Sequence, residues 1–135
     1  MTRALRLGVL IAVCAAASPA AQQGTTGGEW RTWGGDLGVT RYAPLAQITA
    51  DNFRTLQVAW RFKTDSLGSR PDYNLQTTPL MVNGVLYATA GEHRNAVALN
   101  AATGELLWMH RLEEGRRAQL SSRRMSGRGV GYWTD

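Results

Sequence analysis

Residues 98–108 read ALNAATGELLW, a short polar turn between a small apolar residue and a tryptophan. Asn and Gly tolerate positive φ more readily than other residues, and a Thr hydroxyl can hydrogen-bond back to nearby main chain. The turn from Asn100 to Gly104 therefore predicts a hairpin that joins two antiparallel strands, with Ala98 on one strand and Trp108 on the other.

Two more strands are predicted immediately before this hairpin. Residues 79–82 and 85–90 flank Asn83-Gly84, the strongest signal for a two-residue hairpin, because a type I′ turn needs positive φ at both positions. The third and fourth strands, 95–99 and 105–110, follow through short connections. Successive strands joined in this way form an antiparallel meander, so we expect a four-stranded sheet.

This meander carries apolar side chains that other parts of a fold must cover. They are Leu80, Val82, Val85, Tyr87, Val97, Leu99, Leu106 and Trp108. A four-stranded meander stacked face to face on similar sheets is a blade of a β-propeller. The predicted fold is therefore all-β, a β-propeller fragment with about one four-stranded blade and parts of its neighbours.

Apolar stretches on both sides of the meander predict those neighbouring parts. Residues 56–63 place a large apolar side chain at every second position, which is typical of a strand with one buried face. Residues 129–133, GVGYW, predict the start of another strand. Trp60, Trp108 and Trp133 recur at unequal intervals, so the sequence defines no fixed repeat length.

The N-terminus is typical of a secretory signal peptide over residues 1–21. Arg3 and Arg6 precede an apolar run that is too short to span a bilayer as a mature helix, and small residues follow at 18–20. A buried N-terminal helix is the weaker alternative, because both arginines come before the apolar run. We expect a flexible spacer at 22–28 and a propeller domain over 29–135.

The only cysteine, Cys14, lies within this predicted signal peptide. The mature chain would therefore have neither an internal disulfide nor a thiolate metal site. A cysteine in a leader also permits a lipoprotein, although Val13 before it is larger than the residue that usually precedes a lipidated cysteine.

The net charge of the chain is +5, and much of the excess lies in one segment. Six arginines there face only Glu113 and Glu114: Arg111, Arg116, Arg117, Arg123, Arg124 and Arg128. Such a run can follow phosphates, but it lacks the interleaved aromatic residues of a single-strand binder and lies behind an export signal. We therefore expect a solvated loop and no nucleic-acid partner.

Taken together, the motifs resemble the pyrroloquinoline quinone (PQQ)-dependent dehydrogenases. The hairpin is similar to the tryptophan-docking repeat of that family, in which the tryptophan of one blade packs on the turn of the next. The other matching stretches are EWRTWGGD at 29–36, TRYAPL at 40–45, Gln47-Ile48, VAWRFKT at 58–64 and TPLMVNGVLY at 78–87. The resemblance extends from about Glu29 to Asp135.

The resemblance implies an eight-bladed quinoprotein propeller that holds PQQ and Ca²⁺ near its axis. Such an enzyme oxidises an alcohol or a sugar in the periplasm and passes electrons to a cytochrome c or a membrane quinone. In this family the catalytic aspartate and the Ca²⁺ ligands lie further along the chain, so we expect them beyond residue 135. The 135 residues are then expected to be an N-terminal fragment or a truncated reading frame, inactive alone.

Two residues of this chain match cofactor-binding positions of the family. Gln76 lies where relatives often have a Glu that contacts the cofactor, and Arg128 matches an Arg that pairs with a cofactor carboxylate. An Arg offers a bidentate fork of donors with a permanent charge, and a neutral Gln amide can donate where a Glu anion would repel. Turn closure before Pro79 and a solvated loop position are the alternative roles of Gln76 and Arg128.

The chain departs from the family at one point. Several alcohol dehydrogenases of the family have adjacent cysteines shortly before the matching arginine, whereas this chain has Ser122-Arg123. That departure favours glucose-dehydrogenase-like or uncharacterised members over the methanol type and does not define the substrate. The alternative function is a non-catalytic propeller scaffold, such as an outer-membrane-assembly lipoprotein, which Cys14 alone favours.

Overall fold

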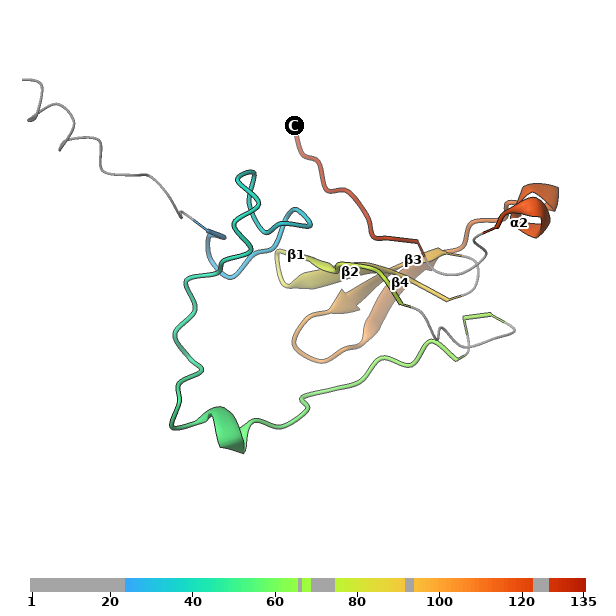
Figure 1. The fold of residues 1–135 in the computed structure, drawn as a ribbon. Coiled ribbons are helices and arrows are strands. Elements are labelled where there is room, and N and C mark those ends of the chain that lie inside the picture. Colours follow the sequence, from blue (N-terminus) through green and yellow to red (C-terminus); the bar gives the residue numbers. More distant parts are fainter. Residues whose placement is uncertain (1–23, 66, 69–74, 92–93, 123–126) are drawn as a thin grey trace, which may run out of the picture.

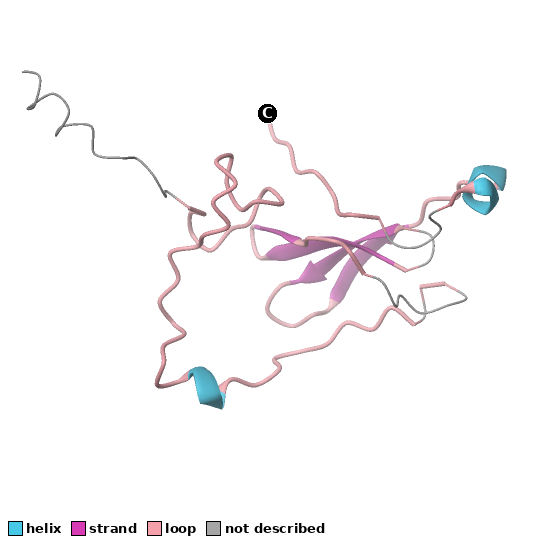
Figure 2. Cartoon of the chain, viewed as in Figure 1, coloured by secondary structure: helices cyan, strands magenta, loops and turns pink. Residues whose placement is uncertain are grey.

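The centre of the molecule is a four-stranded antiparallel sheet (Figures 1 and 2). The structure is a computed structural model, and it describes residues 24–65, 67–68, 75–91, 94–122 and 127–135. The strands lie side by side in chain order and are β1 (Leu80–Val82), β2 (Val85–Ala90), β3 (Asn95–Asn100) and β4 (Leu106–His110). The predicted meander is confirmed, with every strand end within one residue of its expected position.

The turn between β1 and β2 has the expected geometry. Asn83 has φ +51° and Gly84 has φ +74°, the two positive values that a type I′ turn requires. Because Val82 pairs directly with Val85, the turn sets the register of the first hairpin. The sheet begins at Leu80, one residue after Pro79.

The turn between β3 and β4 is held by side chains as well as by glycine. The Asn100 Oδ1 accepts hydrogen bonds from the main-chain N–H groups of Ala102 (2.9 Å) and Thr103 (3.1 Å). The Thr103 hydroxyl accepts one from the N–H of Glu105 at 3.3 Å. Gly104 alone in this turn takes a positive φ, +74°. Asn100 therefore stabilises the turn through its amide and not through a left-handed backbone.

Trp60 packs on this turn from outside the sheet. Its indole Nε1–H donates to the carbonyl oxygen of Ala101 at 3.1 Å. A Cβ atom on Gly104 would lie only 2.5 Å from Cδ2 of the indole, so the ring rests directly on the glycine backbone. The packing of a tryptophan on a blade's turn, which the family resemblance implies, is thus present at Trp60.

The two faces of the sheet have different coverings. Ala88, Ala90 and Val97 form a buried apolar cluster on one face, against which Phe62 and Leu67 pack. The other face carries the cross-strand row Leu80, Tyr87, Ala98 and Trp108. The segment before β1 covers the first face, and the C-terminal segment lies along the second.

The predicted strand at 56–63 is wrong. The segment contains no strand, and Leu56 and Val58 are 53% and 65% exposed. Only Trp60 and Phe62 lie against the sheet. Alternating apolar side chains are typical of a strand with one buried face, but a strand also needs a backbone neighbour. This segment crosses a face of the sheet and meets no free edge.

The predicted strand at 129–133 is wrong for a related reason. This segment contains no strand, but runs over the face that carries Leu80, Tyr87 and Trp108. Together with those residues it lines an open pocket of about 380 Å³. Trp108 is still 48% exposed, so much of its indole is uncovered.

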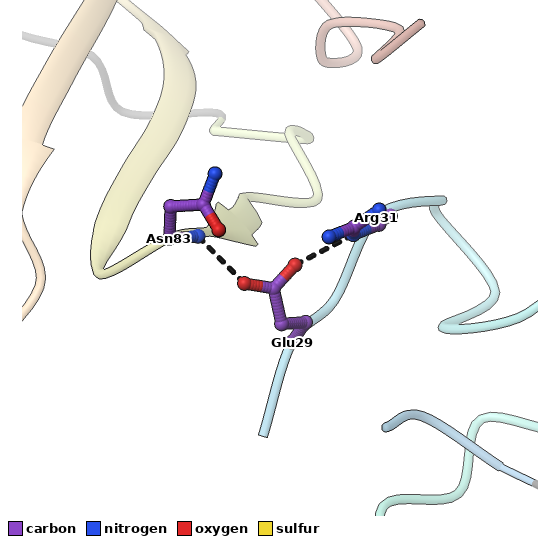
Figure 3. Close-up of polar contacts among 3 residues, drawn as sticks. All are labelled: Glu29, Arg31 and Asn83. Atoms are coloured by element: carbon purple, nitrogen blue, oxygen red, sulfur yellow. Dashed lines mark hydrogen bonds and ion pairs between the residues drawn. The ribbon is translucent and has the colours of Figure 1, made fainter. Parts of the chain in front are cut away.

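An opening segment, residues 24–42, joins the free edge of β1. Trp30 and Met81 form an antiparallel bridge with N···O distances of 2.8 Å and 3.0 Å. Beside it, the Glu29 carboxylate accepts hydrogen bonds from the Asn83 N–H (2.7 Å) and from Arg31 Nε (2.6 Å) (Figure 3). The contacts of Trp30 with Met81 and of Glu29 with Asn83 join distant parts of the chain and are not visible in the sequence pattern.

Two short helical turns were also not predicted. A 3₁₀ turn, η1, spans Phe53–Thr55, and a helix, α2, spans Arg116–Leu120. The segment after β4 that was expected to be only a loop therefore contains a helical turn. The predicted signal peptide, Cys14 and the first two spacer residues lie outside the described residues. No helix in the described part of the chain is long and apolar enough to cross a membrane.

Candidate functional site

Two segments that are distant in sequence meet at the end of the sheet where β1 begins and β2 ends. Thr89, the next-to-last residue of β2, contacts both. Its main-chain N–H lies 3.4 Å from the Thr77 hydroxyl oxygen, which accepts the hydrogen bond. Its own hydroxyl donates to the carbonyl oxygen of Gly127 at 3.0 Å. Residues 76–78 and 127–129 are therefore held together at this end of the sheet.

The chain packs closely on both sides of Arg128, at two positions occupied by glycine. A Cβ atom on Gly127 would lie 3.3 Å from the Thr89 Cγ2, and one on Gly129 would lie 3.3 Å from the Thr78 carbonyl oxygen. Gly129 also has φ +133°, which L-residues seldom adopt. The glycines let the backbone that carries Arg128 approach the strand closely.

Both predicted cofactor residues lie on these two segments. Gln76 immediately precedes Thr77 and is exposed, and Arg128 is exposed between its two glycines. The structure therefore brings together the two stretches of main chain that carry them, although 51 residues of sequence lie between. Their role toward a cofactor stays a prediction.

The acidic residues after β4 are used in ion pairs. Glu114 pairs with Arg94, which lies between β2 and β3, and Glu113 pairs with Arg111 Nε at 2.7 Å. These pairs balance the charges of Arg94 and Arg111. Arg116 is exposed on α2. Arg123 and Arg124 lie outside the described residues, and so does His93.

Two carboxylates of the opening segment have pKa values below their ordinary range, and both serve the structure. The Asn83 N–H, followed by Arg31, lowers the pKa of Glu29. The Thr40 N–H and hydroxyl, at 2.9 Å and 2.7 Å, lower the pKa of Asp36. Hydrogen bonds to the charged form cause both shifts. Each carboxylate is therefore fully engaged in holding its loop.

Among the described residues, no three His, Cys, Asp or Glu side chains gather as metal ligands would. His110 ends β4 and is exposed. Among the described residues, the candidate site at 76–78 and 127–129 is thus one for an organic ligand, and no metal-ligand cluster is found.

Thr89 is the residue of this site that the sequence pattern did not reveal. It is buried, at 7% exposure, in a strand whose other members are mostly apolar. A hydroxyl in the sequence VLYATA was the available signal, because a buried hydroxyl needs a hydrogen-bond partner. The identity of that partner, Gly127, depends on tertiary structure.

Comparison with known proteins agrees with this architecture. Residues 30–135 match the family described as glucose/ethanol/alcohol dehydrogenase, β-propeller domain. The dehydrogenase subunit of the quinone alcohol dehydrogenase of Gluconobacter oxydans is 36% identical over 107 residues, which are 78% of this chain and 13% of that protein. Quinohemoprotein alcohol dehydrogenase ADH IIB of Pseudomonas putida is 35% identical over 129 residues, 93% of this chain and 18% of that protein.

A solved structure gives the same result. The quinohemoprotein alcohol dehydrogenase ADHIIG of Pseudomonas putida HK5 superposes with a TM-score of 0.67 at 34% identity, over 78% of this chain and 15% of that one. The chain thus spans less than a fifth of the length of each of these relatives. The matched family, the similar sheet and the docked tryptophan agree, and the chain belongs to the PQQ-dependent dehydrogenase family as part of its β-propeller domain.

Proposed function

We propose that the protein is a periplasmic PQQ-dependent dehydrogenase that oxidises an alcohol or a sugar and passes the electrons to a cytochrome c or a membrane quinone. The names of its relatives support an alcohol as substrate and a cytochrome as acceptor. One relative, 44% identical over 84 residues that are 62% of this chain and 11% of that protein, is the 1-butanol dehydrogenase (cytochrome c) of Thauera butanivorans. The sequence of residues 1–21 supports export.

The observation that carries the proposal is the meeting of residues 76–78 with residues 127–129. Thr89 hydrogen-bonds to both segments, so the backbones that carry Gln76 and Arg128 lie at the same end of the sheet. Both side chains are exposed and therefore accessible to a ligand. Two residues that contact one cofactor must lie on neighbouring stretches of chain, and this arrangement meets that requirement.

The chemistry of the two residues fits PQQ, which is a tricarboxylate. Arg128 would pair with a carboxylate through its two parallel N–H donors. Gln76 would donate an amide N–H without the repulsion that a Glu anion would bring. Gly127 and Gly129 have no side-chain atoms next to Arg128, which suits close packing of the backbone on a flat ligand.

When bound, PQQ supplies the centre that accepts two electrons from the substrate, and the protein contributes orientation and charge. Ca²⁺ is part of the proposal as a second cofactor, with ligands expected beyond residue 135. Within this chain, the task of Arg128 and Gln76 is to hold and orient PQQ.

Titration of PQQ into the protein at its natural length, with Ca²⁺ present, tests the proposal. A hydrogen bond to a charged group is worth about 1.5–3 kcal/mol, so Arg128→Ala, which removes such bonds, should weaken PQQ binding by at least about 10-fold. Arg116→Ala removes an exposed arginine from α2 and should leave the affinity unchanged. Equal affinities of Arg128→Ala and the wild type would exclude Arg128 from the site.

Dye reduction with a panel of primary alcohols and sugars tests the reaction itself. We expect reduction with at least one alcohol after loading with PQQ and Ca²⁺. A loaded protein that reduces no dye with any of these substrates would favour the non-catalytic scaffold instead.

A further inference from the structure

Thr89 is hydrogen-bonded to both segments of the candidate site, to one through its side chain and to the other through its main-chain N–H. Its hydroxyl donates to Gly127 O, 38 residues away in sequence, and its N–H donates to the Thr77 hydroxyl, 12 residues away. The side chain is almost fully buried, at 7% exposure. Because it belongs to β2, in the middle of the hydrogen-bonded sheet, its position is set by the pairing of Thr89 with Ala96 of β3.

The two bonds have different consequences for the site. The N–H bond depends only on the backbone of β2 and orients Thr77, which follows Gln76. The hydroxyl bond depends on the threonine side chain and holds the carbonyl of Gly127, which precedes Arg128. The methyl group contributes as well, because Gly127 packs against Cγ2 of Thr89. The position of Arg128 therefore depends on the Thr89 hydroxyl.

We infer that Thr89 is a positioning residue for PQQ binding, which acts by fixing the backbone of Arg128 relative to Gln76. This inference rests on the proposed function, because Arg128 must contact the cofactor for its position to matter. Thr89 itself is buried behind the two segments, and its effect on the cofactor is indirect. A residue held on a rigid strand can place a ligand group more accurately than a loop alone can.

A purely structural role predicts a different result from a positioning role. Removing a hydrogen bond from any buried threonine lowers the stability of the protein. A loss of stability alone therefore does not distinguish a structural role from a positioning role. A positioning role predicts in addition that PQQ affinity falls and that this fall depends on Arg128.

The test measures PQQ affinity, with Ca²⁺ present, in the protein at its natural length. Thr89→Val keeps the shape and the N–H and removes only the hydroxyl donor, so we expect binding weakened about three- to tenfold, the value of one hydrogen bond. Thr89→Ser restores the donor and should bind within about twofold of the wild type. The matched control is Thr32→Val. The hydroxyl of Thr32 also donates to a main-chain carbonyl, that of Asp36, at 3.1 Å. Thr32→Val should lower stability and leave the affinity unchanged.

A double variant makes the mechanism testable. If Thr89 acts through Arg128, Thr89→Val combined with Arg128→Ala should bind PQQ no more weakly than Arg128→Ala alone. Fully additive losses would overturn the inference. So would unchanged affinity of Thr89→Val in the same experiment in which Arg128→Ala weakens binding. If Arg128→Ala also has no effect, the proposed site is wrong and the inference falls with it.

A second readout is independent of the cofactor. Without PQQ, Thr89→Val should increase hydrogen–deuterium exchange in peptide 127–133, because the segment has lost its bond to β2. Thr32→Val should leave exchange in this peptide unchanged. Unaltered exchange in Thr89→Val would show that the hydroxyl does not hold the segment.

Discussion

Replacing Gly104 by alanine should destabilise the blade far more than a simple glycine substitution does. Gly104 has φ +74°, a left-handed conformation that costs an L-residue about 1–2 kcal/mol. The new methyl group would also lie 2.5 Å from Cδ2 and 2.6 Å from Cε3 of the Trp60 indole. Atoms this close cannot coexist, so the ring must move away from the turn.

The displaced ring loses a second contribution. Its Nε1–H bond to the Ala101 carbonyl, 3.1 Å long, is worth about 1 kcal/mol. The ring also leaves its contacts on the Gly104 backbone, and a partly buried aromatic ring contributes about another 1 kcal/mol. We therefore expect Gly104→Ala to lower the free energy of unfolding by roughly 3–4 kcal/mol.

Gly84 provides a matched control within the same sheet. It has the same φ, +74°, but nothing lies within 4 Å of the position of a Cβ atom. Gly84→Ala therefore carries the backbone cost of about 1–2 kcal/mol without a clash. The difference between the two variants measures the docking of Trp60 on the turn.

Urea unfolding, followed by far-UV circular dichroism on the protein at its natural length, measures these values. Hydrogen–deuterium exchange of peptide 98–108 localises the effect. In a Trp60→Ala background the clash is absent, so Gly104→Ala should cost no more than Gly84→Ala. The reasoning is refuted if the two glycine variants are equally stable, or if Gly104→Ala costs the same with and without the indole.

Two further substitutions test single hydrogen-bonded groups. Because the Asn83 N–H and then Arg31 lower the pKa of Glu29 from its ordinary value of 4.5, its folded pKa lies below its unfolded pKa. The stabilisation that ionised Glu29 gives the folded protein is therefore complete above pH 4.5 and is lost as the pH falls through the pKa of the folded state. The urea midpoints of the wild type and of Glu29→Gln should converge in acid. A difference between these midpoints that stays constant from pH 7 to pH 3 would contradict this. Asn100→Ala removes the acceptor for two main-chain N–H groups and should cost about 1–2 kcal/mol in urea unfolding. Asn100→Asp keeps the acceptor and should retain most of that stability, whereas equal losses in the two variants would show that the side-chain oxygen does not hold the turn.

The sequence predicted those parts of the blade that depend on neighbouring residues. Asn83-Gly84 imposes its turn because few other dipeptides accept two positive φ values. The side chains of Asn100 and Thr103 hold the next turn through bonds to main-chain groups two or three residues away. The apolar residues between these turns therefore had to be strands of one meander.

The predictions failed where strand formation depends on a partner. Residues 56–63 and 129–133 have suitable side chains, but both cross faces of the sheet and pair with no strand in the described part of the chain. Side-chain alternation describes which residues can be buried. It does not determine whether a hydrogen-bonding edge lies beside them.

The candidate site shows the same division. The amino-acid sequence by itself determined the four strands and their turns, and the family resemblance predicted Gln76 and Arg128 as residues whose chemistry suits an anionic cofactor. Only the tertiary structure decided that their segments meet, and that Thr89 connects them. The physical reason is distance along the chain: a turn is stabilised by groups a few residues apart, whereas the bond from Thr89 to Gly127 spans 38 residues and forms only after the sheet has positioned both ends.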